Sequence, residues 1–143
     1  MCSSDLTFSP DGSGLLVSAG DLRAMSTYET PLRLWNATTG VPIRDFRTSE
    51  PCGDSSKGQC AVSQVSFSPD GRHLVAAVLA TGQGWVWDVR TGAVTAKLPT
   101  VFTTGAAVFS PDGSRIVTGS RGQAVVQIWD AVGYQPQIGR AHV

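Results

Sequence analysis

The stretch Phe-Ser-Pro-Asp-Gly decides the fold, because it stands three times in the chain, at residues 8–12, 67–71 and 109–113. Each copy has the composition of a tight turn between two apolar segments. Proline presets φ at the second turn position, aspartate can bond its own backbone, and glycine accepts the left-handed conformation that closes the turn. We predict one β-hairpin per copy, in which the closing glycine resists any replacement that carries a Cβ. The closing glycines are Gly12, Gly71 and Gly113.

A tryptophan follows each copy at the end of an apolar segment. These tryptophans are Trp35, Trp87 and Trp129. In the second and third copies the tryptophan stands 20 positions after the phenylalanine, whereas in the first copy it stands 27 positions after it. The last two copies start 42 residues apart and the first two 59 apart. A fixed period indicates a repeat architecture, and we infer insertions within 21–31 and within 41–66.

Each repeat is predicted to contain four short strands. In the second repeat, the segments rich in Val, Leu, Ala and aromatic residues are 62–68, 73–79, 84–89 and 93–98. Turn residues separate these segments, as expected for strands joined by hairpins. A second turn, "TTG" at 38–40 and "RTG" at 90–92, returns the chain after the tryptophan strand.

The succession of F-S-P-D-G, Trp-Asp and T-G at this spacing resembles the WD-repeat (WD40) family of β-propellers, over nearly the whole chain. The resemblance implies an all-β fold, a partial β-propeller of about three four-stranded antiparallel blades. Two family features are missing: the Gly-His pair before the first strand, and the aspartate in the turn before the tryptophan strand. Asn36 also replaces the aspartate of the first Trp-Asp pair. We therefore expect these blades to depend more on apolar packing.

The repeat sets the expected boundaries of the chain. We predict a blade over 7–48, a Cys-, Gly- and Ser-rich inserted loop over 49–61, a second blade over 62–98 and an incomplete third blade over 105–137. The ends, 1–6 and 138–143, break the pattern. A DNA that codes for the first end has a reverse complement that codes for Ile-Gly-Arg-Ala-His, so both ends resemble one translated sequencing adapter. We interpret them as a non-native head and tail, and the GTG start that this requires as a sign of a prokaryotic gene.

Three blades do not close a ring. Propellers have about four to eight blades, and each blade buries its faces only against its neighbours. The sequence therefore predicts that further blades of the same parent chain are missing, or that two or three copies of the chain complete a ring by self-association.

Charge and hydropathy restrict the partners. The chain has 11 basic and 11 acidic residues, so it offers no basic field to a nucleic acid. Its longest apolar runs, such as 74–80, are strand-sized, and none could span a membrane. We expect no nucleic acid and no membrane as partner. A cytoplasmic location is favoured by the lack of a signal-peptide pattern, provided that Met1 is the true start.

Two cysteines of the inserted loop form a candidate disulfide. Cys52 and Cys60 lie eight residues apart, and a disulfide there would contribute about 2–3 kcal/mol in an oxidising compartment. Reduced surface thiols are the alternative. Two thiols alone cannot complete a zinc site, and Cys2 lies in the head. We predict no metal and no cofactor.

No residue pattern predicts catalysis. The repeated aspartates, Asp11, Asp70 and Asp112, are expected to serve the turns, because equivalent turns on separate blades lie too far apart to share a metal. His73 is expected to face solvent at a strand start, and His142 falls in the tail. Trp85 and Trp87 share a strand face and are expected to pack against the next blade. No G-x-S-x-G, H-E-x-x-H or G-x-G-x-x-G motif has suitable flanks.

By the family resemblance, the parent protein is a non-catalytic scaffold for protein–protein interaction. The insertions, over 21–31 and 41–61, are where partner-specific contacts are expected, since loops on rigid scaffolds carry recognition. The alternative is a propeller appendage of a larger enzyme or signalling protein, such as a kinase, peptidase or ATPase, whose catalytic domain lies outside this chain. Residues 7–137 do not distinguish the two.

Overall fold

A computed structural model of the chain describes residues 6–10, 12, 15–19, 29–48, 62–78, 82–100, 104–120 and 122–142. Every regular element in these ranges is a β-strand. The strands of the first sheet are β1 (Leu6–Phe8), β2 (Leu15–Ala19), β3 (Glu29–Asn36) and β4 (Pro42–Arg47). Those of the second are β5 (Val62–Phe67), β6 (His73–Val78), β7 (Gln83–Asp88) and β8 (Val94–Leu98). Those of the third are β9 (Thr104–Phe109), β10 (Arg115–Ser120), β11 (Val125–Asp130) and β12 (Pro136–His142).

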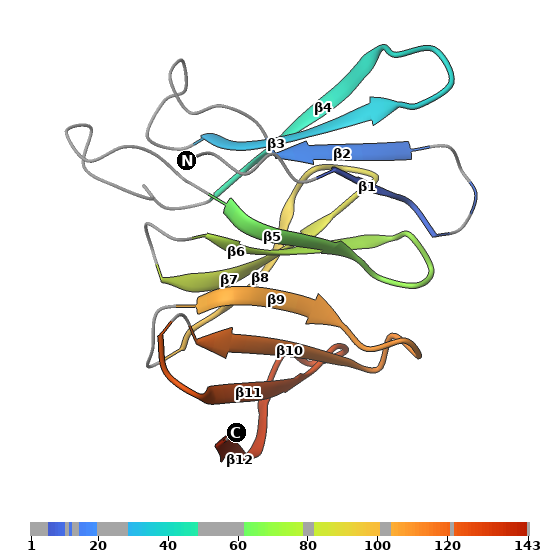
Figure 1. Cartoon of the computed structure of the whole chain (residues 1–143). Coiled ribbons are helices and arrows are strands. Elements are labelled where there is room, and N and C mark those ends of the chain that lie inside the picture. The colour runs from blue at the N-terminus through green and yellow to red at the C-terminus, as the bar shows by residue number, and fades with distance from the viewer. Residues whose placement is uncertain are drawn as a thin grey trace, which may run out of the picture.

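Each sheet is an antiparallel meander whose strands pair in sequence order, and the three sheets stack face to face (Figure 1). We refer to them as blade 1, blade 2 and blade 3. The predicted all-β fold of about three four-stranded antiparallel blades is confirmed. In blade 2 each strand lies within one residue of its predicted bounds, because alternating apolar residues and hairpin turns both mark the strand ends.

Blade 3 has four strands in the structure. The sequence predicts it to be incomplete after residue 137, yet residues 136–142 form β12 and pair with β11. A strand ladder is made by backbone groups, so it does not require the side-chain pattern of the other blades. The register shifts between Gln127 and Trp129. The native or non-native origin of residues 138–143 stays a prediction.

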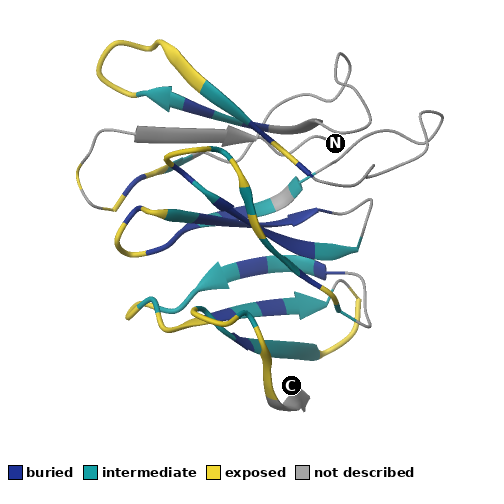
Figure 2. Ribbon diagram, turned by 180° about the vertical axis from the view of Figure 1, so that it is seen from behind, coloured by how far each residue is buried: buried dark blue, intermediate teal, exposed yellow. Residues whose placement is uncertain are grey.

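The core lies between the blades. One cluster of buried apolar residues joins blade 1 to blade 2, and another joins blade 2 to blade 3. Strand β6 serves both, because its side chains alternate between the two faces of the sheet and every residue from Leu74 to Val78 is fully buried. In Figure 2 buried residues fill the middle of the stack, and exposed ones gather at the turns. Blade 2 is therefore covered on both faces by its neighbours.

Candidate interaction surface

The Ser-Pro-Asp-Gly turns are closed by side chains as well as by backbone. In blade 2 the Ser68 hydroxyl donates to Asp70 Oδ1 at 2.6 Å and accepts from His73 N at 2.9 Å. Asp70 Oδ1 also accepts from Arg72 N at 3.0 Å. Blade 3 repeats this network: Asp112 Oδ1 accepts from the Ser110 hydroxyl and from Ser114 N, and the Ser110 hydroxyl accepts from Arg115 N. Both described aspartates thus hold turn geometry, as the sequence predicts.

The closing glycines adopt the left-handed conformation that the turn needs. Their φ angles are 75° at Gly12, 73° at Gly71 and 75° at Gly113. At Gly113 a Cβ would also lie 3.3 Å from Pro69 Cδ of the neighbouring blade. A replacement there is opposed by both backbone conformation and space.

The residue after each tryptophan caps the second turn of its blade. Asp88 Oδ1 accepts from Arg90 N at 2.9 Å and from Thr91 N at 3.0 Å. Asn36 does the same in blade 1 with its amide oxygen. The drift from aspartate to asparagine in the first copy is therefore conservative, because the side-chain oxygen is the atom that the turn uses.

The tryptophan N–H groups of blades 2 and 3 find partners without the aspartate that the family often supplies. Trp87 Nε1 donates to Arg47 O of blade 1 at 2.7 Å, and its ring packs edge-on against Phe46, with the centroids 6.0 Å apart. Trp129 Nε1 donates to Thr118 Oγ1 of its own blade at 2.9 Å. Burial of an indole requires such an acceptor, and here a carbonyl and a hydroxyl provide it.

The expected direction of packing of Trp85 and Trp87 was wrong. Both belong to the cluster that joins blade 2 to the preceding blade, together with Phe46. The alternation along β7 explains this, because the tryptophans share one face and Val86 takes the other, toward blade 3.

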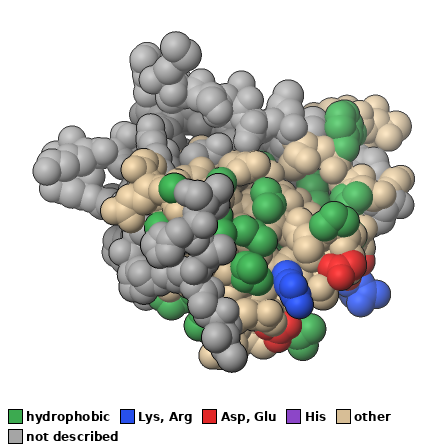
Figure 3. Space-filling view, turned by 60° about the horizontal axis from the view of Figure 1, so that its bottom comes forward, with side chains coloured by type: hydrophobic (Ala, Val, Ile, Leu, Met, Phe, Trp, Pro, Cys, Tyr) green, Lys and Arg blue, Asp and Glu red, His purple; other side chains and the backbone are tan. Residues whose placement is uncertain are grey.

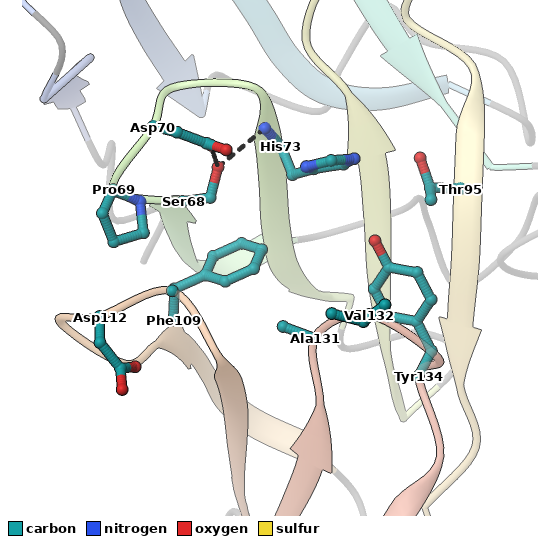
Figure 4. A pocket seen from close by; sticks show the side chains of 11 residues that line it. Ser68, Pro69, Asp70, His73, Thr95, Phe109, Asp112, Ala131, Val132 and Tyr134 are labelled. Carbon is teal, nitrogen blue, oxygen red and sulfur yellow. Dashed lines mark hydrogen bonds between the residues drawn. The ribbon is translucent and has the colours of Figure 1, made fainter.

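A groove opens between each pair of neighbouring blades, at the end of the stack where the Ser-Pro-Asp-Gly turns lie. The first groove, between blades 1 and 2, has a volume of about 830 Å³. The second groove, between blades 2 and 3, has a volume of about 570 Å³. Figure 4 shows the second groove, with Ser68, Asp70 and His73 on one wall, and Phe109 and Tyr134 pointing in from the other.

Tyr134 occupies a position that glycine holds in the other blades. It stands five residues after Trp129, as Gly40 and Gly92 do after their tryptophans, and its φ is 55°. A side chain in this conformation is unfavourable, and its ring packs against the cluster between blades 2 and 3. Burial, and then the charges of Asp70 and Asp88, raise the pKa of the Tyr134 hydroxyl. The phenol therefore stays protonated, and it can donate a hydrogen bond.

The groove aspartates are held in their charged form. The hydroxyl of Ser68 and then the N–H of Arg72 lower the pKa of Asp70 by hydrogen bonding. For Asp88, burial opposes the charged form, but hydrogen bonds from the N–H groups of Thr91 and Arg90 outweigh it and lower the pKa.

The structure places the other predicted residues as follows. His73 lines both grooves, so it faces the surface as expected, but beside two carboxylates. The candidate disulfide of Cys52 and Cys60 lies outside the described residues, as do Asp11 and most of both insertions.

Sequence reasoning missed Arg44, Thr118 and Tyr134, which acquire roles only at contacts between strands or blades. Tyr134 could have been identified from the sequence, because it stands at a turn position that glycine holds in the other two blades.

Within the described ranges, no group of three or more His, Cys, Asp or Glu residues lies close enough to hold a metal ion. The same part of the chain has no helix long and apolar enough to cross a membrane.

Comparisons with known proteins support the fold. The chain is similar over 96% of its length to a chain of a solved structure titled Kuenenia stuttgartiensis Hydrazine Synthase, with a TM-score of 0.74 and 16% sequence identity. This chain spans 35% of the length of that one. At this identity the likeness concerns the fold, and it extends to 806 solved chains, so it identifies no single activity. No curated protein sequence matches the chain significantly.

Family comparison identifies the repeats themselves. Residues 51–88 and 99–130 match the family described as "WD domain, G-beta repeat". These ranges contain β5 to β7 and β9 to β11, with the turns and tryptophans described above. Domains built of such repeats usually mediate protein interactions and are generally non-catalytic. Blades 2 and 3 are therefore WD repeats, and the chain is a WD-repeat protein of the β-propeller kind.

Proposed function

We propose that the chain is a non-catalytic scaffold that binds protein partners in the grooves between its blades. One observation carries the proposal: the two grooves share a frame but differ in their lining. The turn aspartates recur in both, as Asp70 and Asp112. The residues at the rim differ between the two grooves. A constant frame with variable rim residues is how rigid scaffolds build recognition surfaces.

The lining residues suit a protein partner. Apolar side chains stand exposed at the rims, with Val132 at 85% and Ile43 at 42% exposure, beside the charged and hydroxyl groups of the turns. A mixed apolar and polar lining is typical of surfaces that bind proteins transiently.

Selection of binders from a displayed library of random peptides tests this function. We expect enrichment of peptides on the immobilised chain, and weaker binding of those peptides after Val132→Glu or Ile43→Glu. Thr39→Glu, on an exposed turn outside both groove linings, is the control. A selection that yields no peptide above the bare matrix, or peptides that ignore both groove substitutions, would contradict the proposal.

A further inference from the structure

We propose that the first groove binds an acidic segment of a protein partner, through three arginines that the blades themselves do not need. This inference rests on the proposed function and specifies the partner's chemistry at one site. The arginines that line the groove are Arg44, Arg72 and Arg90. Arg44 comes from β4 of blade 1, and the other two come from the turns of blade 2.

The backbone brings these residues together. Val89 N donates to Arg72 O at 2.9 Å, which sets Arg72 beside Arg90. Arg44 reaches the same turn from blade 1: its Cδ lies 3.4 Å, and its Nη1 3.9 Å, from the place that a Cβ on Gly92 would take. The glycine therefore leaves room for the arginine side chain to lie across the boundary between the blades.

The protein does not pair these three groups with acceptors of its own. Within the described ranges, none of the three guanidinium groups forms an ion pair or a hydrogen bond, whereas Arg33 pairs with Asp45 in blade 1. The Nε of Arg44 is buried and has no hydrogen-bond partner there. Buried donors are normally satisfied, and an orphan calls for an explanation. The guanidinium groups are thus available to an acceptor from outside.

The two aspartates of the groove already accept hydrogen bonds from the turns that they stabilise. Asp70 accepts from Ser68 and from Arg72 N, and Asp88 accepts from the N–H groups of the turn that follows it. Three arginines against two aspartates leave a formal charge of +1 with His73 neutral. The groove therefore attracts a negative group, although the whole chain has no net charge.

The second groove serves as an internal control. One repeat further along, the positions of the arginines are held by Ala96, Ser114 and Val132. The aspartates recur at the equivalent positions of blade 3 as Asp112 and Asp130, with the same turn bonds. Residues that the blade needs recur in both repeats, and the arginines do not. Their presence in the first groove is therefore not a requirement of the fold.

The lining favours a peptide over a free anion. Ile43 is exposed beside the buried Leu34 and Val89, so the groove combines an apolar surface with cationic groups. Guanidinium groups bind carboxylates in bidentate fashion, and an apolar side chain next to the carboxylate would cover Ile43. At about 830 Å³ the groove is larger than one small anion fills.

Fluorescence anisotropy with the full chain tests the proposal. The probe is a fluorescein-labelled peptide of glutamate, leucine and glycine, and its counterpart has lysine in place of each glutamate. We expect only the acidic peptide to bind, and its affinity to fall with added salt. The double variant R72A/R90A should bind at least about tenfold more weakly, because each substitution removes a charged hydrogen-bond donor. Arg115→Ala is the matched control, since Arg115 is equally exposed but lies in blade 3.

Each other outcome overturns the proposal. If Arg115→Ala weakened peptide binding as much as R72A/R90A does, the attraction would be a general effect of charge. If R72A/R90A bound the peptide with unchanged affinity, the peptide would bind elsewhere. Displacement of the peptide by inorganic phosphate at equal concentration would indicate a small-anion site. If the acidic peptide fails while library-selected peptides bind, this inference falls and the proposed function stands. If neither binds, both fall.

Discussion

At the scale of the residue, the aspartate of each Ser-Pro-Asp-Gly turn acts as a hydrogen-bond acceptor and not as a catalytic carboxylate. Asp112 shows this most clearly. The hydroxyl of Ser110, then the N–H and hydroxyl of Ser114, donate to it and lower its pKa from 3.8 to about 2. All three interactions favour the ionised form, because a carboxylate accepts more hydrogen bonds than a carboxylic acid.

This pKa shift predicts a loss of stability in acid. The folded pKa lies below the unfolded one, so the stabilisation is fully present above pH 3.8 and is lost as the pH falls through about 2. We expect Asp112→Asn to remove this part of the pH dependence and to leave the rest of the curve unchanged. Urea unfolding across that pH range measures it, and Asp130→Asn, in the second turn of the same blade, is the comparison. A titration of Asp112 followed by NMR that gave an ordinary pKa would contradict the prediction.

The roles of the groove arginines and of Tyr134 could not be predicted from the repeat pattern alone. Tyr134 stands at a turn position that glycine holds in the other two blades, and Arg44 lies over the glycine of the equivalent turn in blade 2. In the first groove the large side chain comes from the preceding blade, as Arg44. In the second groove it comes from the following blade, as Tyr134. The sequence contains both exchanges, but their meaning depends on which blade edge faces which turn.

At the scale of the element, blade 3 depends on a buried polar contact that replaces the family's aspartate. Trp129 donates to Thr118 Oγ1, and the Thr118 residue is fully buried. We expect Thr118→Val to lower the free energy of unfolding by about 1–3 kcal/mol, because the indole N–H loses its acceptor in the core. Urea denaturation measures this loss.

A double-mutant cycle separates this hydrogen bond from packing. Thr118→Ser keeps the hydroxyl and should recover most of the stability. In a Trp129→Phe background, which lacks the N–H donor, Thr118→Val should cost much less than in the original chain. An equal cost in both backgrounds would show that the hydrogen bond contributes little.

Gly84 of β7 stands in a tightly packed place, between Leu98 of its own blade and Thr118 of blade 3. A Cβ there would lie 3.2 Å from Leu98 Cδ1 and 3.4 Å from Thr118 Cγ2, and both of these residues are fully buried. We therefore expect Gly84→Ala to destabilise the chain by about 1–3 kcal/mol. Gly119→Ala is the control, because its Cβ would make only an ordinary contact, 3.9 Å from Ala106 Cβ. Equal thermal unfolding temperatures for the two variants would contradict the tight packing around Gly84.

Strands and hairpins were predictable because their causes are local. The turn residues and the alternation of apolar side chains place β5 to β8 within one residue of the structure. Strand β12 was not predictable, since its backbone pairs with β11 without the usual side-chain pattern. The direction in which Trp85 and Trp87 pack was also beyond the sequence, because alternation separates two faces without saying which neighbour covers each.

At the scale of the whole molecule, the degree of burial depends on the position of a blade in the stack. Val75 and Val86 of blade 2 are fully buried by blade 3. Their counterparts one repeat further along, Val117 and Ile128, are only half-buried. Figure 3 brings this end of the molecule forward and shows hydrophobic side chains spread over it, with few charged ones among them. The outer face of blade 3 therefore resembles a blade interface that lacks its neighbour.

This face predicts self-association through blade 3. An apolar sheet face in water favours contact with a similar face, so the chain should associate as its concentration rises. Ile128→Glu should shift it toward the monomer, because a carboxylate at the centre of such a contact would be desolvated. Val132→Glu adds the same charge at an exposed turn and should leave association unchanged. Sedimentation velocity over a range of concentrations separates the three proteins. If all three were monomeric throughout, the outer face of blade 3 would need no neighbour, and burial of Val75 and Val86 would reflect packing within this chain alone.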